Sequence, residues 1–205
     1  MSTEHGASET VLRAIRNRRS ITRMKPDPVP RALIEKWLDA AVWVANHRVT
    51  EPWTFYVLED DAKRRFAELR RDFQRSRLPN PDAPEAQPAL DKSYASAADT
   101  PAIIVFACRP SDDPELGEED VWATYSAAYA VMLAAWSDGV GTYFRSGGIR
   151  EYAPLRELLG LAPDQRIIGM LYVGYPAEVP QRRRTPAPTK TVWLAARQGR
   201  NGEGR

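Results

Sequence analysis

The chain has 205 residues, enough to bury a sizeable core, and we expect a single domain over residues 1–205. Its 43% hydrophobic and 27% charged residues are typical of a globular protein, which argues against a disordered or membrane-embedded chain. The 29 basic residues nearly cancel the 27 acidic ones, and a net charge of +2 lacks the basic excess of general nucleic-acid binders.

Location is predicted from the cysteine content and the apolar runs. Cys108 is the only cysteine, so no disulfide can form within the chain and a reducing cytoplasm is expected. The N-terminal stretch MSTEHGASET lacks the pattern of a secretion signal. The uncharged run from Val121 to Ser137 is shorter than the roughly 20 residues that span a bilayer, so it predicts a buried helix and no membrane partner.

The N-terminal third predicts two helices and a strand. Ser8 or Thr10 is expected to cap a short helix that ends at Asn17. The inner face of that helix is expected to carry Val11, Leu12 and Ile15. After PDPVP, apolar residues recur at helical spacing from Leu33 to Val42, and PWTFYVLE then predicts a strand.

The middle of the chain predicts a charged helix and an irregular excursion. From Asp60 to Arg77, arginines alternate with acidic residues, which favours a solvated helix face over a phosphate-binding surface. The Pro- and Ala-rich stretch from Leu78 to Thr100 predicts a lid or a mobile loop, with one helical turn near Leu90.

The second half predicts three strands separated by helices. AIIVFAC is an unbroken apolar run that predicts a central strand. An uncharged helix from about Glu119 to Asp138 follows, then the strand GTYFR, a short helix in REYAPLRELLG and the buried strand RIIGMLYVGYP. The ordered core is expected over residues 11–194, with a disordered tail at 195–205. This order predicts an α+β fold with a sheet wrapped by helices.

The stretch IRNRRSITRMKPDPVP surrounds Ser20 with Arg16, Arg18, Arg19 and Arg23. Four guanidinium groups so close together repel one another unless an anion lies among them. Bidentate donors next to a hydroxyl suit a terminal phosphate group. The alternative, ordinary surface arginines at a loop end, stays open on these residues alone.

Several other kinds of site are disfavoured. His5 and His47 are the only histidines and have no cysteine partners at ligand spacing, so no metal site is expected. A P-loop and a complete dinucleotide fingerprint are absent. Ser146 in FRSGG lacks the nucleophile-elbow pattern, which disfavours a serine hydrolase, and no catalytic side chain is expected.

Four segments in this order resemble the nitroreductase family of FMN-dependent oxidoreductases. They are RNRRSITR, AAVWVANHRVTEPWTFYVLE, GVGTYFRSGG with LRELLGL after it, and IIGMLYVGYP. The resemblance is strongest to a small bacterial subgroup of NAD(P)H nitroreductases. It implies a mostly antiparallel sheet surrounded by helices, in an intertwined homodimer with FMN at the subunit interface.

The resemblance also implies site residues, position by position. The positions that match FMN contacts in the family are Arg18, Arg19, Ser20, Trp43, His47, Phe144, Arg145, Ser146 and Arg184. A stretch assigned to NADP in the subgroup matches Ala134, Ala135, Trp136, Ser137, Asp138 and Gly139. The uncharged helix would supply dimer contacts through Val121, Tyr125, Ala128, Met132 and Trp136. Glu51 stands where the family often has glutamine, and faces either the pocket or Arg48.

The activity implied is electron transfer from NAD(P)H through FMN to a nitroaromatic, quinone or similar acceptor, by a ping-pong mechanism. The alternative is a protein of the same fold that binds or sequesters flavin without efficient turnover. A basic nucleic-acid-binding module is the third hypothesis. The acceptor and the preference between NADH and NADPH are not determined by these residues.

Overall fold

A computed structural model describes residues 3–194 and has a four-stranded antiparallel sheet with the order β1-β2-β4-β3. The strands are β1 (Trp53–Leu58), β2 (Ala102–Cys108), β3 (Gly141–Arg145) and β4 (Arg166–Gly174), and each pairs antiparallel with its neighbours. The predicted central position of AIIVFAC is confirmed, since β2 lies between β1 and β4 and is buried along its whole length.

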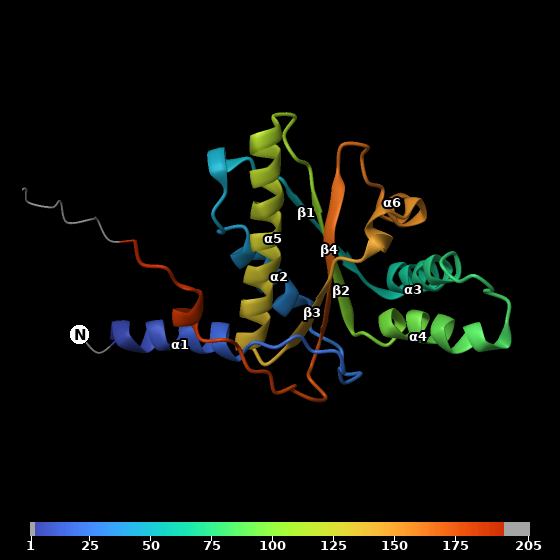
Figure 1. The fold of residues 1–205 in the computed structure, drawn as a ribbon, viewed down its shortest axis with the longest axis horizontal. Helices are drawn as coiled ribbons and strands as arrows, with labels where there is room; N and C mark the ends of the chain where they lie inside the picture. The colour runs from blue at the N-terminus through green and yellow to red at the C-terminus, as the bar shows by residue number, and fades with distance from the viewer. Residues whose placement is uncertain (1–2, 195–205) are drawn as a thin grey trace, which may run out of the picture.

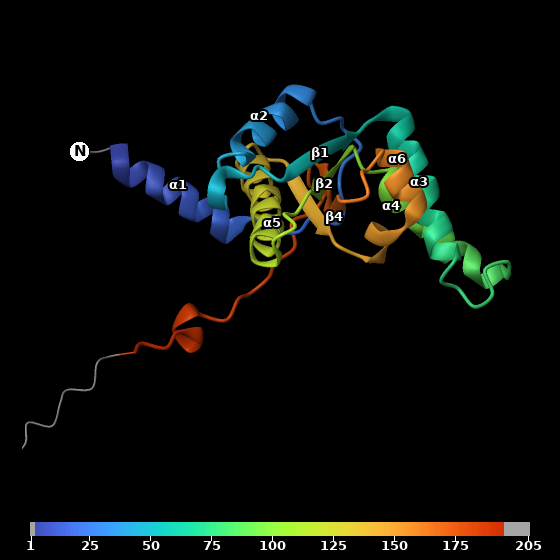
Figure 2. The same cartoon turned by 90° about the horizontal axis from the view of Figure 1, so that it is seen from above.

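Helices cover both faces of the sheet (Figures 1 and 2). On one face lie α2 (Arg31–Ala41) and α5 (Pro114–Ser137), and on the other lie α3 (Asp60–Arg75), α4 (Gln87–Ala98) and α6 (Ala153–Leu159). Short 3₁₀ turns occur at His47–Val49, Pro84–Ala86, Gly148–Glu151 and Ala187–Lys190. This arrangement confirms the α+β prediction.

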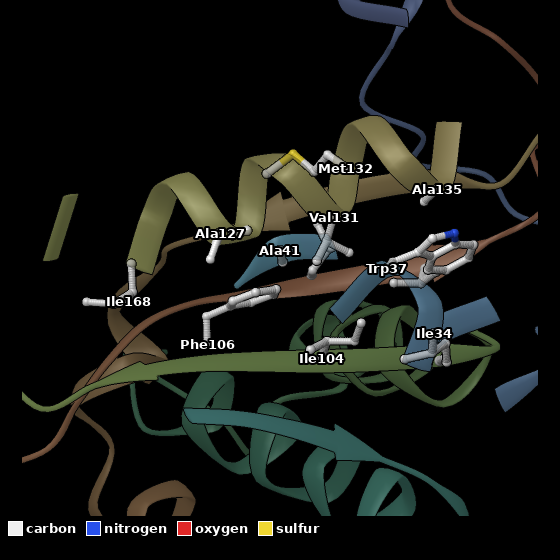
Figure 3. Packing of buried hydrophobic residues seen from close by; sticks show 14 of the residues in the cluster. Ile34, Trp37, Ala41, Ile104, Phe106, Ala127, Val131, Met132, Ala135 and Ile168 are labelled. Carbon is white, nitrogen blue, oxygen red and sulfur yellow. The ribbon is translucent and has the colours of Figure 1, made fainter. Parts of the chain in front are cut away.

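Alternation along β2 divides the core into two layers. Ile104 and Phe106 point toward α2 and α5, whereas Ile103 and Val105 point toward α3 and α6. Figure 3 shows the first layer, in which Trp37 and other α2 side chains lie between the sheet and α5. Both faces of the sheet therefore bury apolar side chains, as the continuous apolar run of β2 requires.

Helix α5 begins earlier than its uncharged run. The carboxylate of Asp113 accepts hydrogen bonds from the amides of Glu115 and Leu116, both at 3.0 Å, and Pro114 occupies the first turn. The expected start near Glu119 was therefore wrong by about one turn, because the capping signal in the polar loop was not recognised. Among residues 3–194, no helix is long and apolar enough to cross a membrane.

Two predictions about the N-terminal helix were also wrong. Helix α1 spans Thr3–Asn17, so Ser8 and Thr10 lie inside it and do not cap it. Its apolar stripe is not an inner face, because Val11 and Ile15 are 58% and 44% exposed. In both views α1 projects away from the sheet (Figures 1 and 2).

Two of the dimer contacts predicted on α5 lie in the chain's own core. Ala128 and Met132 are buried in the chain's own core, so they are not available for contacts with a second subunit. Trp122 and Tyr125, in contrast, are 59% and 48% exposed. The helix is uncharged from Val121 to Ser137, but this chain covers only one side of it.

The stretch from 78 to 100 is more regular than the predicted loop with one helical turn, and its action as a lid stays a prediction. It contains the three-turn helix α4, which packs against α3 through the buried residues Leu90, Ser93 and Ala97. The Ser93 hydroxyl donates a hydrogen bond to the Arg70 carbonyl at 2.9 Å. The prolines that suggested a loop precede the helix or lie in its first turn, where a missing N–H costs little.

Candidate functional site

The arginine-rich segment after α1 lies along the edge strand β3. Ser20 forms an isolated parallel bridge with Thr142, and the Ile21 amide donates to the Thr142 carbonyl at 2.9 Å. Gly141 permits this approach, because a Cβ there would lie 2.6 Å from the Ile21 side chain. The predicted phosphate-binding segment is therefore held against the sheet.

Arg18 and Arg19 use their guanidinium groups differently. Arg18 is half-buried, and its guanidinium carbon lies 5.8 Å from the centre of the Tyr129 ring on α5. Its Nε is buried and has no hydrogen-bond partner within residues 3–194. Arg19 instead donates to the carbonyls of Arg16 and Arg18, at 2.7 and 3.0 Å, at the end of α1. Arg18, next to the exposed Ser20, is therefore the donor available to an anion.

The predicted cluster of four arginines does not converge as a whole. Arg23 forms an ion pair with Glu178 at 3.2 Å, so its charge is already matched by a carboxylate. The chain supplies no carboxylate to Arg18 or Arg19 within the part that the structure describes. The anion predicted from the sequence would therefore meet Arg18 rather than all four arginines.

Phe144 and Arg145 point to opposite faces of the sheet, as adjacent residues in a strand must. The Phe144 ring contacts Tyr125 edge to face with a centroid distance of 5.3 Å. Gly169 on β4 leaves room for this ring, since a Cβ there would collide with it. Ser146 follows the end of the strand and is exposed. The three predicted residues therefore surround the edge of β3 instead of lining one wall.

Arg145 lies beside a cavity of about 450 Å³ on the α4 face. The cavity is bounded by the segment after α1, by α4 and by the β3 edge. It is lined by Ile21, Thr22, Arg23, Met24, Lys92, Ala95, Ser96, Asp99, Thr100, Tyr143, Arg145 and Tyr172. Its wall combines two tyrosine rings with three cationic side chains and one carboxylate, a composition that suits a planar polar ring.

Tyr172 brings an unsatisfied polar atom to this cavity. The residue is 2% exposed, and its hydroxyl has no hydrogen-bond partner within residues 3–194. Burial raises the pKa of Tyr172, and the nearby guanidinium groups of Arg70 and Arg145 oppose that rise. A buried hydroxyl without a partner is costly, so a ligand that accepts or donates here would remove that cost.

Trp43 and His47 lie on the loop between α2 and β1, and neither lines the 450 Å³ cavity. Trp43 is 86% exposed. His47 Nδ1 lies 2.5 Å from a carboxylate oxygen of Glu119 on α5. The backbone of this loop is strained, since Arg48, Val49 and Glu51 all have positive φ.

The loop is anchored by hydrogen bonds of its own. The Thr50 hydroxyl donates to the buried carboxylate of Asp120 at 2.5 Å, and the Glu51 amide donates to Asn46 Oδ1 at 2.7 Å. Glu51 is exposed and makes no ion pair with Arg48 within the described residues. These hydrogen bonds tie the loop to α5 and within itself, and its exposed residues are not among those that line the cavity.

The stretch from Ala134 to Gly139, matched to NADP, forms the end of α5 and the turn that follows. Ala135 is fully buried, Ala134 and Trp136 are half-buried, and Ser137 is exposed. The Asp138 carboxylate accepts hydrogen bonds from the Trp37 indole at 2.7 Å and from Lys36 at 3.0 Å, which lowers its pKa. Asp138 thus joins α2 to α5.

Arg184 lies exposed in the tail beyond β4, away from the residues that line the cavity. Its role toward a cofactor stays a prediction.

Sequence reasoning missed Tyr172 and Arg70. Arg70 was grouped with the solvated arginines of α3, but it is half-buried and lies 6.0 Å from the Tyr172 ring. Its spacing was the available signal, because it follows the buried Phe66 by four residues and precedes Phe73 by three. Tyr172 gave no signal, since it stands within an apolar strand.

Comparison with known proteins agrees with this architecture. A family model described as "Nitroreductase family" matches residues 15–175. The Bacillus subtilis (strain 168) protein named "Putative NAD(P)H nitroreductase YfhC" is 33% identical over 187 residues, which cover 90% of this chain and 94% of that protein.

Solved structures show the same fold. The nitroreductase-like family protein from Bacillus cereus has a TM-score of 0.76 and 27% identity, covering 90% of this chain and 95% of that one. The FMN-dependent nitroreductase NfnB from Mycobacterium smegmatis, in complex with NADPH, has a TM-score of 0.71 at 16% identity, covering 92% of this chain and 100% of that one. The antiparallel sheet, the helices on both faces and these matches place the chain in the nitroreductase family.

Proposed function

We propose that this protein is an FMN-dependent oxidoreductase that passes electrons from NAD(P)H to a nitroaromatic, quinone or similar acceptor. Membership of the nitroreductase family supports the general activity. The name of the YfhC relative and the FMN and NADPH in the description of NfnB support the cofactor and the electron donor. The proposal rests most on one observation, the unpaired Arg18 Nε beside Ser20 at the edge of the cavity-bearing strand.

The residues fit FMN. Arg18 and Ser20 would hold the phosphate, because the Arg18 Nε, which has no partner among residues 3–194, and the exposed Ser20 hydroxyl can donate hydrogen bonds to it. The cavity of about 450 Å³ lies within the usual range of roughly 300–1,000 Å³ for ligand pockets. Tyr143 and Arg145 on β3 would bound the ring, and the Tyr172 hydroxyl would gain the partner that it lacks.

Bound FMN would supply the hydride and electron transfer, and this chain would supply position and electrostatics. Lys92 and Arg145 bring positive charge to the cavity wall, which favours negative charge on a ring bound there. No side chain is required as a nucleophile. We expect donor and acceptor to use the same open side of the cavity in turn, which gives ping-pong kinetics.

Exposed apolar side chains support a homodimer. The apolar residues Val11, Leu12 and Ile15 on α1 and Trp122 and Tyr125 on α5 are exposed. Helices α1 and α5 contact each other, and exposed apolar side chains gathered in one region are typical of interfaces. A second subunit would also bring the exposed Trp43 and His47 within reach of a cavity that is not their own.

The absorption spectrum of the purified protein tests the cofactor. The protein should be yellow, and denaturation should release FMN rather than FAD. Stopped-flow addition of NADPH and then NADH should bleach the flavin, whereas a flavin-sequestering protein would keep its colour. Colourless protein that takes up no added FMN would refute the proposal.

Oligomeric state is tested by light scattering coupled to size exclusion. We expect a dimer whose dissociation releases flavin. A monodisperse monomer that retains FMN would contradict the shared site.

A further inference from the structure

A second cavity, of about 160 Å³, adjoins the first at Arg145. Arg145 lines both cavities, and the smaller one also meets Arg70 and Gln74 on α3, Arg77 just after α3, and Ser93 on α4. No aspartate or glutamate is among the residues that line it. Three arginines therefore face one small space with no carboxylate to offset their charge.

The other arginines of α3 show how unusual this is. Arg64 pairs with Asp61 at 2.9 Å, Arg65 pairs with Glu68 at 2.6 Å, and Arg75 pairs with Asp82. These pairs match the solvated helix face predicted from the alternating charges.

Arg70, Arg77 and Arg145 form no ion pair within residues 3–194. Arg77 and Arg145 lie over aromatic rings, with distances of 5.6 Å to Phe73 and 5.3 Å to Tyr172. Arg70 reaches the Ser93 carbonyl only at 3.5 Å. All three therefore keep donors for a ligand.

Burial makes this arrangement costly without a ligand. Burial lowers the pKa of Arg70, Tyr172 opposes this shift, and the charge of Arg145 lowers the pKa further. The ring of Tyr172, a residue that is 2% exposed, lies beside the same two guanidinium groups, and its hydroxyl has no hydrogen-bond partner among residues 3–194. An oxyanion would offset the like charges of these guanidinium groups.

We propose that the space between Arg70, Arg77 and Arg145 is a subsite for one oxyanion, a carboxylate or phosphate group carried by a molecule that enters the neighbouring cavity. The volume suits a single charged substituent, since whole ligands usually need roughly 300 Å³ or more. This inference rests on the proposed function, in which the larger cavity holds the flavin. Two sources share the chemistry: a carboxylate on the electron acceptor and the 2′-phosphate of NADPH.

Calorimetric titration with 4-nitrobenzoate and its neutral analogue 4-nitrobenzamide tests the subsite on the FMN-loaded protein. If the oxyanion is a carboxylate on the acceptor, Arg70→Met and Arg77→Met should each weaken 4-nitrobenzoate binding by about tenfold and change 4-nitrobenzamide binding by less than about twofold. Arg75→Met is the matched control, because this exposed α3 arginine is already paired with Asp82 and should change neither Kd. Arg77 is exposed, so its variant keeps the test valid if Arg70→Met does not fold.

A second arm separates the two sources. If the oxyanion is the 2′-phosphate, Arg77→Met lowers kcat/KM for NADPH about tenfold relative to NADH and leaves the ratio of Kd values for the two nitro compounds unchanged. If the oxyanion is the acceptor's carboxylate, Arg77→Met changes the ratio of Kd values for the two nitro compounds about tenfold and leaves the ratio of kcat/KM for NADPH and NADH unchanged.

The subsite is overturned if Arg70→Met and Arg77→Met change neither the Kd ratio of the two nitro compounds nor the kcat/KM ratio of NADPH and NADH. It is also overturned if they weaken binding of charged and neutral ligands equally. Calorimetry needs no turnover. Protein that binds 4-nitrobenzoate through Arg77 but reduces no acceptor would therefore refute the proposed function and leave the subsite intact.

Discussion

The cores on the two faces of the sheet differ in the partners that their buried polar groups have. Under α2 and α5 the core is apolar, and the indole N–H of Trp37 is satisfied by Asp138 at 2.7 Å. Under α3 and α4, next to β3, the core opens into two cavities, and within residues 3–194 neither Tyr172 nor Arg70 and Arg145 beside it have an acidic partner.

This difference indicates that the two faces have different roles. A buried polar group without a partner costs free energy of folding, and folded proteins contain few such groups. Tyr172 on the α3–α4 side is such a group, and it lines a cavity where ligand atoms can satisfy it. Arg18 Nε, beside Tyr129 of α5, is another, at the edge of the sheet. The core between the sheet and α2 and α5 (the closed face) is packed with apolar side chains. We infer that the α2–α5 face mainly stabilises the fold and that the α3–α4 face mainly binds ligands.

The largest effect is expected on the closed face. Phe106→Ala removes a fully buried ring in contact with Phe55, at a centroid distance of 5.3 Å, and should lower the free energy of unfolding by about 3–5 kcal/mol. Denaturant titration measures this loss, and the exposed Val179→Ala serves as a control that should change little. A loss below about 1 kcal/mol at Phe106 would contradict the assignment of this face to stability.

The next effect concerns FMN binding at the β3 edge. Arg18→Ala removes the unpaired guanidinium beside Ser20 and should weaken FMN binding more than tenfold, corresponding to about 1.5–3 kcal/mol. Arg64→Ala is the control, because its guanidinium pairs with Asp61 on the surface of α3. Fluorescence titration of flavin-free protein gives both Kd values, and equal changes would show that the phosphate binds elsewhere.

A smaller effect should appear in the acid stability of the closed face. Hydrogen bonds from Trp37 and Lys36 lower the pKa of Asp138 below its ordinary value of 3.8. The stability that Asp138 contributes is therefore present above pH 3.8 and is lost as the pH falls from 3.8 through the lower folded-state pKa. Asp138→Asn should remove this loss of stability between pH 3.8 and the lower folded-state pKa. The control Asp112→Asn, at an exposed position, should retain it.

Acid unfolding followed by tryptophan fluorescence from pH 5 to pH 2 measures the difference. Identical acid limbs in wild type and Asp138→Asn would show that the carboxylate does not tie α2 to α5.

The smallest effect on folding is expected at the ligand face. Tyr172→Phe removes a buried hydroxyl that has no partner, so the free energy of unfolding of the flavin-free protein should stay within about 1 kcal/mol of wild type or rise slightly. The same variant should weaken binding of 4-nitrobenzoate to the FMN-loaded protein. A large loss of stability would mean that the hydroxyl is satisfied in the folded chain, which would weaken the contrast between the faces.

Local patterns predicted most of the secondary structure. The central strand Ala102–Cys108 was recognisable because a strand buried on both faces is apolar at every position. The helix over Arg31–Ala41 was recognisable because burial of one face leaves apolar residues at helical spacing. Helix α4 was missed because its apolar period is weak and its prolines dominate the local signal. What makes it a helix is its contact with α3, which no local window contains.

The candidate site was only partly predictable. Arg18 and Ser20 stood out by charge density and by resemblance, and the structure places them together at β3. Phe144 and Arg145 were expected to act together, but strand alternation sends their side chains to opposite faces.

The sequence by itself determined the period of each strand and most helices, the cluster of charges around Ser20 and the resemblance to a family. These depend on residues near one another in the chain. Only the tertiary structure decided which arginines of α3 are paired, that Tyr172 is buried without a partner, and that Arg70, Arg77 and Arg145 share one cavity. Those facts depend on how α3, α4 and the sheet pack, because burial and charge pairing are set by neighbours distant in sequence.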